Sequence, residues 1–230
     1  MIRVLVERDG SLRESEAHHL QVRRAEPGEA VEVRDGEGLV GHGALRRSGK
    51  AWNVEVTASE RMAPPAPLVL AVGAGDRDRF AWLVEKATEL GVTSIVPLEC
   101  ERTAGVATRV RPQHLDRLRR QALEAVKQCG AAWATRVEAP MPLEALAERH
   151  IEGAGWLADV EGRPVPAVVE DVPLTAVIGP EGGLTAAERE RLRAAGYAAI
   201  RLGAHTLRFE TAAIAAAAAA AAGRLRGSHG

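Results

Sequence analysis

Two glycine-containing segments in the C-terminal third of the chain carry residues suited to binding a small ligand. They are residues 179–183, Gly-Pro-Glu-Gly-Gly, and residues 203–208, Gly-Ala-His-Thr-Leu-Arg. Glycine has no Cβ atom, so a ligand can approach the backbone N–H and C=O groups of these segments closely. Each segment precedes a predicted helix, whose first N–H groups can bind a carboxylate or a ring acceptor. We therefore expect both segments to bind a ligand through their backbone.

The elements around these segments predict that they lie together. The apolar runs Thr175–Ile178 and Ala198–Leu202 have the pattern of buried strands, and each ends at one of the glycine segments. Thr185 and Glu188 have the spacing of a capping box, so a helix begins after the first segment and runs to about Ala195. Parallel strands place their carboxyl ends at one edge of a sheet, where open α/β sheets bind ligands. The two segments are expected to form two walls of one pocket.

The rest of the chain divides at the proline-rich stretch 63–67. Before it, strand patterns at 2–6, 30–33 and 52–56 and one helical pattern at 15–25 indicate a small β-rich domain. After it, strand and helix patterns alternate: strands at 68–72, 92–98, near 137 and at 156–157, and helices at 80–90, 112–129 and 143–150. The fold class is therefore α/β, with a parallel sheet covered on both faces. We expect domains at 1–66 and 67–230.

Composition predicts a soluble globular protein. The chain has 230 residues, of which 46% are apolar, with 30 basic and 31 acidic side chains. A net charge of −1 gives no bulk attraction for nucleic acid, so any RNA surface must be local. Cys100 and Cys129 have no metal-ligand or Cys-x-x-Cys spacing, which favours free thiols and no metal site. The N-terminus lacks the features of a signal peptide, and no run predicts a membrane span, so a cytoplasmic location is expected.

Four motifs in fixed order carry a resemblance to a known family. They are Lys86-Ala-Thr-Glu-Leu-Gly-Val, Gln128-Cys-Gly, Ile178-Gly-Pro-Glu-Gly-Gly-Leu, and Leu202-Gly-x-x-x-Leu-Arg-x-Glu-Thr-Ala. Behind a small β domain, this order resembles the RsmE family of SPOUT-class methyltransferases, which methylate N3 of a uridine in 16S ribosomal RNA. The resemblance covers nearly the whole chain.

The resemblance implies a fold and partners that the strand pattern does not supply. It implies a deep trefoil knot in the C-terminal domain, S-adenosyl-L-methionine as cofactor, an N-terminal PUA-like β-barrel, and a homodimer acting on the 30S subunit. The segment His18–Arg24 is similar to the family's PUA-like segment. Arg3, Arg23 and Arg24 could form an RNA-binding strip, and arginines 109, 111, 117, 119 and 120 a second one. For any single arginine, a solvated surface position is the alternative.

Site residues follow from the motifs. The implied cofactor-binding residues are Leu157, Ile178, Gly179, Pro180, Glu181, Gly182, Gly183, Leu202, Gly203, His205, Thr206 and Leu207. Methylation at uracil N3 requires loss of the imide proton and stabilisation of charge developing on O2 or O4. Arg208 is the candidate for that stabilisation. Glu210 and Glu181 are candidate bases, although Glu210 could instead cap the last helix and Glu181 could pair with an arginine. His205 is another possible base.

Three positions depart from the family pattern. Lys127 stands where glutamate is common, Ala131 where arginine is common, and Phe209 where threonine is usual. Because of the first two, no RNA contact can be carried over from the family to the C-terminal end of the predicted helix 112–129. The third leaves Arg208 and Glu210 in place. Two other functions remain open: a knotted methyltransferase acting on another RNA, such as a tRNA ribose, and a non-catalytic RNA-binding ribosome-assembly factor.

Overall fold

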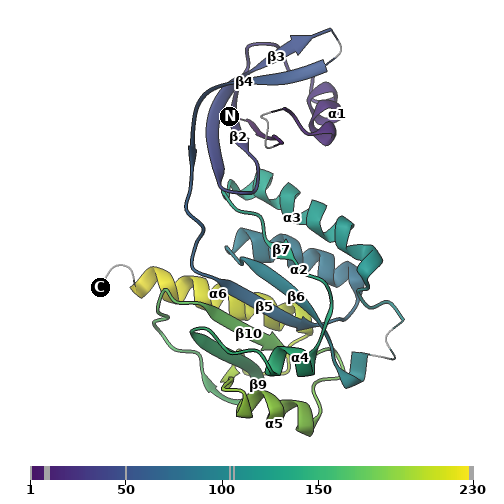
Figure 1. Ribbon diagram of the computed structural model, residues 1–230, viewed down its shortest axis with the longest axis vertical. Helices are drawn as coiled ribbons and strands as arrows, with labels where there is room; N and C mark the ends of the chain where they lie inside the picture. Colours follow the sequence, from purple (N-terminus) through teal and green to yellow (C-terminus); the bar gives the residue numbers. More distant parts are fainter. Residues whose placement is uncertain (1, 8–10, 50, 104, 106, 228–230) are drawn as a thin grey trace. The chain divides into compact units, whose positions relative to one another are not determined.

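The computed structural model describes residues 2–7, 11–49, 51–103, 105 and 107–227 (Figure 1). The chain forms two compact units. The first comprises Met1–Pro64 together with Leu123–Ala134, and the second comprises Pro65–Ala122 and Thr135–Gly230. The first unit therefore includes a segment that comes from far beyond the proline-rich stretch.

The first unit is a mixed four-stranded sheet with one helix. Its strands are β1 (Ile2–Leu5), β2 (Ala30–Arg34), β3 (Leu39–Ser48) and β4 (Ala51–Arg61), in the order β1-β2-β3-β4. β1 pairs with β2 in parallel, and the other neighbours are antiparallel. Helix α1 (Glu14–Val22) contributes Leu20 to a core that also contains Val4, Val31 and Leu45. The β-rich domain predicted from the sequence is confirmed.

Strand β3 was not among the strands predicted by pattern, and its two glycines explain why. Gly41 and Gly43 break the apolar alternation, and glycine is disfavoured in strands. In the structure a Cβ atom on Gly41 would lie 2.8 Å from the Ala58 carbonyl oxygen, and one on Gly43 would lie 2.5 Å from that of Glu55. The pairing of β3 with β4 shifts register between His42 and Gly43. Glycine is required here because the two backbones approach closely at a bulge.

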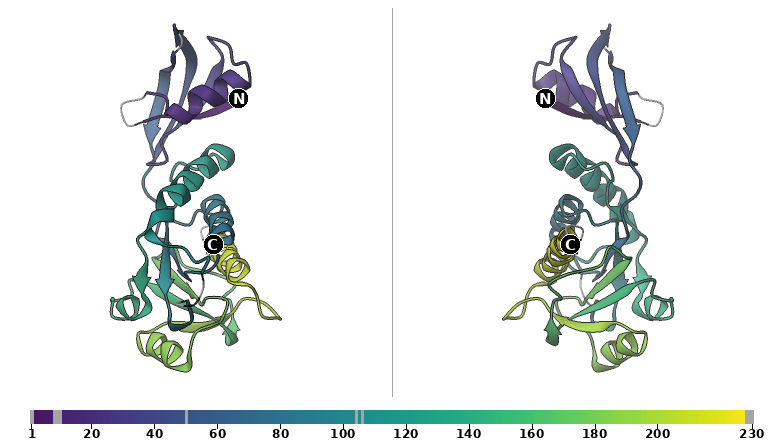
Figure 2. Two further views of the ribbon diagram at one scale, coloured as in Figure 1. Left: turned by 90° about the vertical axis from the view of Figure 1, so that its right-hand side faces the viewer. Right: turned by 90° about the vertical axis from the view of Figure 1, so that its left-hand side faces the viewer.

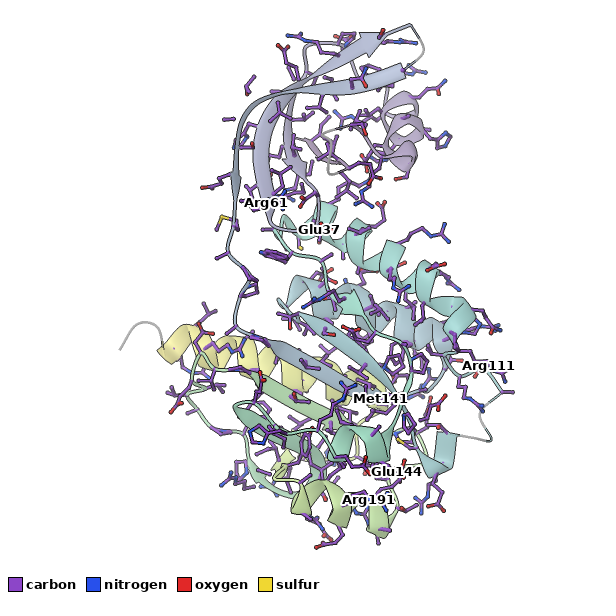
Figure 3. All side chains as sticks on the ribbon, viewed as in Figure 1. Glu37, Arg61, Arg111, Met141, Glu144 and Arg191 are labelled. Carbon is purple, nitrogen blue, oxygen red and sulfur yellow. The ribbon has the colours of Figure 1, made fainter. Side chains whose placement is uncertain are left out.

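A tight turn follows β2 and is stabilised by Asp35. The Asp35 Oδ1 atom accepts hydrogen bonds from the backbone N–H groups of Glu37 (2.6 Å) and Leu39 (2.9 Å). Arg61 donates to Asp35 Oδ2 (3.2 Å) and to the Glu37 carbonyl (2.8 Å), and Figure 3 labels Arg61 and Glu37 side by side. The nearly buried carboxylate thereby has partners on both oxygens, as buried charges require.

Helix α3 (Leu115–Cys129) runs from the second unit into the first, and its C-terminal end is bound by arginines. Arg3 donates to the carbonyl oxygens of Gln128 (2.8 Å) and Lys127 (3.3 Å) and to Glu32 (2.8 Å). Cations at a helix C-terminus stabilise its unpaired carbonyls. The hydrogen bond from Arg3 holds the pKa of Glu32 below its ordinary value.

The second unit is built on a parallel sheet in the order β11-β9-β10-β5-β6-β7, with β8 also paired to β6. Its strands are β5 (Leu68–Gly73), β6 (Ser94–Glu99), β7 (Arg136–Val137), β8 (Met141–Pro142), β9 (Ala154–Pro164), β10 (Leu174–Ile178) and β11 (Ala198–Arg201). Its other helices are α2 (Arg77–Glu89), α4 (Leu143–Ala147), α5 (Ala186–Ala194) and α6 (Phe209–Gly227), with short 3₁₀ turns at Glu101–Thr103 and Pro112–His114. Every strand pair is parallel.

Helices cover both faces of this sheet (Figure 2). Leu143 and Leu146 of α4 and Leu192 of α5 pack with Ala71 of β5 and Val177 of β10 on one face. On the other face α6 contacts β5 and β10, and α2 contacts α6. Because side chains alternate along a strand, both faces of β5 and β10 are buried, which accounts for their continuous apolar sequences. The predicted parallel α/β sheet is confirmed, whereas the knot stays a prediction.

Candidate cofactor and catalytic site

The two glycine segments line one cavity of the second unit. It has a volume of about 300 Å³, at the lower end of the range of roughly 300–1,000 Å³ that is common for small-molecule sites. Its lining residues are Ala158, Asp159, Val160, Ile178, Gly179, Pro180, Glu181, Gly183, Leu184, Arg189, Arg201, Leu202, Gly203, His205, Thr206, Leu207, Phe209 and Ala212. The segments after β10 and β11 are thus brought together, as the strand pattern predicted.

All the predicted cofactor residues except Leu157 and Gly182 belong to this lining. Leu157 is fully buried in β9 within the apolar core, one residue before the lining residue Ala158. Gly182 packs instead against Arg102, whose Cβ would lie 3.3 Å from a Cβ atom at position 182.

Local backbone chemistry shapes the segment Gly179–Leu184, named the cofactor loop below. Gly183 has a φ of +70°, in the left-handed region that glycine adopts without steric cost. A Cβ atom on Gly73 would collide with the backbone of Pro180, so the loops after β5 and β10 touch directly. The predicted capping box is present: Glu188 N–H donates to Thr185 Oγ1 (3.2 Å), and Thr185 N–H donates to Glu188 Oε2 (2.8 Å).

Glu181 connects the cofactor loop to the N-terminus of α2. Its Oε1 atom accepts a hydrogen bond from the Asp76 N–H at 3.2 Å. A Cβ atom on Gly75 would lie 2.8 Å from both carboxylate oxygens, so only glycine leaves room for this carboxylate. Glu181 also lines the cavity. It is therefore placed for a positioning role and for contact with a bound ligand.

Arg208 and Glu210 lie at the start of α6 and differ in exposure. The Arg208 side chain is exposed, whereas Glu210 is 9% exposed. Arg79 of α2 approaches Glu210 Oε1 at 3.6 Å, and Glu210 Oε2 is buried with no hydrogen-bond partner among the described residues. A carboxylate in the first turn is also favoured by the helix dipole. Both residues flank Phe209, which lines the cavity, although neither belongs to the lining.

Several lining residues were not predicted, and Asp159 is the most informative. Its Oδ1 atom accepts from the Glu161 N–H (3.0 Å) and its Oδ2 atom from Arg193 (3.0 Å). Asp159 lies on β9, which is 11 residues long and runs between β10 and β11. The local sequence pattern gave no signal for it, because β9 reaches the cavity through its place between β10 and β11 in the sheet.

Phe209 replaces the usual threonine of the family, and its surroundings explain how the larger side chain fits. The ring stacks on Phe80 of α2, with centroids 6.4 Å apart and planes inclined by 29°. A Cβ atom added to Gly75 would lie only 2.8 Å from the edge of this ring. The ring is 2% exposed, so it belongs to the wall of the cavity and is not an exposed stacking surface.

The cavity lining carries charges of both signs. Arg189, Arg201 and His205 contribute basic groups, and Asp159 and Glu181 contribute carboxylates. S-adenosylmethionine combines a sulfonium and an ammonium group with a carboxylate, and its adenine and ribose need backbone partners at short range. The glycine-lined walls and the mixed charges therefore fit this cofactor.

The predicted RNA-binding arginines have different environments in the first unit. Arg3 is engaged with Glu32 and the end of α3, and Arg23 donates to Glu29 at 2.5 Å. Arg24 has a φ of +57°, a conformation that is uncommon for a residue with a side chain. Of the three, Arg24 is the one whose side chain has no hydrogen bond or ion pair with another described residue.

Lys127, another departure from the family, forms a buried ion pair in the first unit. Its Nζ atom lies 2.9 Å from Glu16 Oε1 and 3.0 Å from Glu124 Oε2, and Glu16 is fully buried. Burial alone would lower the pKa of Lys127, but the hydrogen bonds to Glu16 and Glu124 outweigh it and raise the pKa. The departure is thus explained by a structural partner on α1.

Neither a metal centre nor a membrane-spanning helix is found among the described residues. No group of three or more His, Cys, Asp or Glu side chains there is placed to hold a metal ion. No described helix combines the length and apolar character needed to cross a membrane.

Comparison with known proteins agrees with this geometry. Residues 62–221 match the family model described as an RNA methyltransferase domain, and residues 12–59 match that of an RNA methyltransferase PUA domain. The chain is 31% identical to ribosomal RNA small subunit methyltransferase E of Aquifex aeolicus, over 88% of this chain and 90% of that protein. It is also 31% identical to the protein of that name from Synechocystis, over 90% and 71%.

A solved structure extends the similarity to the fold. The crystal structure of ribosomal RNA small subunit methyltransferase E from Neisseria gonorrhoeae, bound to S-adenosyl methionine, superposes with a TM-score of 0.83 at 26% identity, covering 95% of this chain and 96% of that one. Together with the two family models and the parallel sheet that ends in two glycine loops, these matches show that the chain belongs to the ribosomal RNA small subunit methyltransferase E family.

Proposed function

We propose that this protein uses S-adenosyl-L-methionine to methylate N3 of a uridine in 16S ribosomal RNA of the small subunit. The observation that carries the proposal is the single cavity lined by both glycine loops and by side chains of both charges. Names of the relatives supply the class of substrate, and the resemblance of the motifs supplies the uridine N3 position. A substrate in the ribosome also supports a cytoplasmic location.

Different residues of this chain would bind the cofactor and accept the proton. The bound cofactor supplies a methyl group made electrophilic by its sulfonium. Backbone groups of the cofactor loop and of residues 202–207 would orient it. As the N3–CH₃ bond forms, the N3–H proton must pass to a base. Glu181 is the candidate carboxylate that lines the cavity, and Glu210, with a buried unpartnered oxygen, is the alternative.

Arg208 is proposed to stabilise the negative charge that develops on uracil O2 or O4. Its guanidinium is exposed at the start of α6, beside the cavity residue Phe209, where a flipped base could reach it. A fixed set of donors matches a developing oxyanion, and removing one such donor typically costs on the order of 10²–10³ in rate.

We expect Arg208→Ala to lower the methyl-transfer rate about 10²-fold or more while leaving the dissociation constant for S-adenosylmethionine within a few-fold of the unmodified protein. Single-turnover methylation and calorimetric titration measure the two quantities. Arg226→Ala, which removes an exposed arginine at the other end of α6, is the control. An equal loss of cofactor binding and rate would make Arg208 a cofactor-binding residue only.

We also propose residues 1–66 as the RNA-binding domain and residues 67–230 as the methyltransferase domain, with Leu123–Ala134 grouped with the first of these by its contacts. The match of residues 12–59 to a PUA domain of RNA methyltransferases supports it. Arg24 is the leading phosphate contact, with Arg23 beside it, whereas Arg3 would have to leave the end of α3 to contact RNA. Such contacts position RNA without reading its sequence.

The decisive experiment is methylation with labelled S-adenosylmethionine on three substrates: naked 16S rRNA, intact 30S subunits and bulk tRNA. Label in 3-methyluridine of 16S rRNA or of 30S subunits supports the proposal. Label in a tRNA ribose would favour another RNA as substrate. No binding of the cofactor by calorimetry would leave a non-catalytic assembly factor as the function.

A homodimer is proposed as the working form. Residues Ala212 to Ala222 are all alanine except Ile214, and the positions of α6 that face away from the sheet, including residues 214, 215, 218 and 219, are only partly buried within one chain. Small side chains permit close approach of a second helix. The resemblance to the family is the second support for the dimer.

A further inference from the structure

The turn that follows β6 contacts the cofactor loop at Gly182 and the helix after it at Glu188, although the turn contributes nothing to the cavity lining. This turn, residues Cys100–Thr103, is named the β6 turn. Its strand lies beside β5, and β5 lies beside β10, so the carboxyl ends of three neighbouring strands meet at this edge. The contacts join segments that are 80 or more residues apart in sequence.

The first contact is made by the buried carboxylate of Glu188. Its Oε2 atom accepts from the Thr185 N–H, which completes the capping box at the end of the cofactor loop. Its Oε1 atom accepts from the Glu101 N–H at 2.8 Å. Glu188 is 4% exposed, so both bonds form away from solvent, where an unpaired carboxylate would be costly. A capping box alone needs only one of these oxygens.

The second contact is made by Arg102. Its NH1 atom donates to the Gly182 carbonyl oxygen at 2.5 Å, and its methylene groups lie against the Cα atom of Gly182. Gly182 is the one residue of the cofactor loop that does not line the cavity. Arg102 therefore contacts the loop at the one residue that does not line the cavity.

The β6 turn is itself fixed by short hydrogen bonds, so it can act as a support. Thr103 Oγ1 accepts from the Cys100 N–H (3.0 Å) and donates to the Cys100 carbonyl (2.7 Å). The Thr103 side chain is buried. A turn closed on itself in this way loses little further entropy when it binds a neighbouring loop.

We propose that the β6 turn is a brace for the cofactor loop, and that Arg102 and Glu188 are positioning residues for S-adenosylmethionine. They do not touch the ligand. They hold the carbonyl of Gly182 and the amide of Thr185 so that Gly179, Glu181 and Gly183 keep the conformation that lines the cavity. The inference rests on the proposed function, because it takes that cofactor as the ligand.

The test compares Arg102→Ala and Arg102→Lys with the unmodified protein, and uses Arg191→Ala as matched control. Arg191 is also exposed, but it pairs with Glu144 of α4 (3.0 Å) and does not line the cavity. Calorimetry gives the dissociation constant for S-adenosylmethionine, and thermal unfolding without ligand gives the stability. Methylation at saturating cofactor gives kcat separately from the KM for cofactor.

We expect Arg102→Ala to raise the dissociation constant and the KM for the cofactor about three- to tenfold, the effect of losing one hydrogen bond. Because Arg102 is exposed, the melting temperature without ligand and kcat at saturation should match those of Arg191→Ala. Arg102→Lys should recover most of the affinity, since its ammonium can still reach the Gly182 carbonyl.

Three results would overturn the brace: unchanged cofactor affinity in Arg102→Ala, a fall in ligand-free melting temperature large enough to account for the loss, or a fall in kcat alone. If the unmodified protein itself binds no S-adenosylmethionine, the proposed function fails first. Glu188→Gln, compared with the exposed Glu190→Gln on the same helix, adds a second measurement. An affinity for cofactor equal in these two variants would exclude Glu188 from the role.

Discussion

At the scale of single residues, backbone amides are held by carboxylates in several places that matter for the site. Asp76 accepts from two amides of α2, Glu181 from one amide of the loop after β5, and Glu188 from amides of two different loops. The bonds of Asp76 cap α2, whereas those of Glu181 and Glu188 fix the ends of loops. The shape of the site therefore depends on these carboxylate hydrogen-bond acceptors as well as on the glycines of its loops.

Phe209 provides a residue-scale prediction, because the family usually has threonine there. We expect Phe209→Thr to lower the free energy of unfolding by roughly 2–4 kcal/mol, since it deletes a buried ring and its stack on Phe80. Urea unfolding measures the change. Phe209→Leu, which keeps most of the volume, should cost clearly less. Equal stability of Phe209→Thr and the unmodified protein would show that the wall of the cavity closes without the ring.

At the scale of elements, the start of α2 depends on one carboxylate. Asp76 Oδ1 accepts from the amides of Asp78 and Arg79, both at 3.1 Å, the geometry of a helix N-cap. The hydrogen bond from the Arg79 amide holds the pKa of Asp76 below its ordinary value of 3.8. Its stabilising contribution is therefore complete above about pH 3.8 and is lost as the pH falls through the lower pKa of the folded state.

We expect Asp76→Ala to cost about 1 kcal/mol at pH 7, which corresponds to a fall in melting temperature of about 2–4 °C for a chain of this size. The difference from the unmodified protein should shrink as the pH falls below about 3.8. Asp76→Asn, which can still cap the helix, should lose less at pH 7. A difference that stayed constant from pH 7 to pH 3 would contradict the role of the ionised carboxylate.

Helices and strands could be predicted from the sequence wherever their signals lie within a few residues of one another. The strand, glycine loop and capped helix around residues 175–195 were predicted with a boundary error of about one residue, because each signal lies within a few positions of the others. β3 was missed because its glycines, which hide the strand pattern, are required by the close approach of the β4 backbone. The role of β9 in the cavity was missed because it follows from strand order, which local periodicity does not contain.

At the scale of the whole molecule, the family could be predicted from four motifs in order, and the parallel sheet from the alternation of strand and helix patterns. The bonds that join distant segments could not be predicted. The Glu101 amide and the Glu188 carboxylate are 87 residues apart, and Lys127 and Glu16 are 111 residues apart. In sequence these are ordinary charged residues of helices and turns. Only the folded chain shows that they have been removed from water and paired.

The proposed homodimer gives a whole-molecule prediction. The chain has a mass of 24.4 kDa, so light scattering should report about twice that value for the unmodified protein. We expect Ala218→Glu to produce monomers, because it introduces a charge on the outer face of α6. Ala194→Glu, at an exposed position of α5, should remain dimeric. A monomer for the unmodified protein, or a dimer unaffected by Ala218→Glu, would place the contact elsewhere or exclude it.

The passage of α3 from one unit to the other has a consequence for dissecting the protein. A fragment ending at the proline-rich stretch would look like an independent domain by sequence, yet it would lack Leu123–Ala134. Glu16, which is fully buried in the intact chain, would then lose its ammonium partner Lys127, and the loss of one partner of a buried pair costs about 3–5 kcal/mol. Severing the chain where its composition changes would thus separate the first unit from a segment that belongs to it. Assays of the isolated N-terminal fragment would report on an incomplete unit, so the intact polypeptide is the form in which RNA binding should be measured.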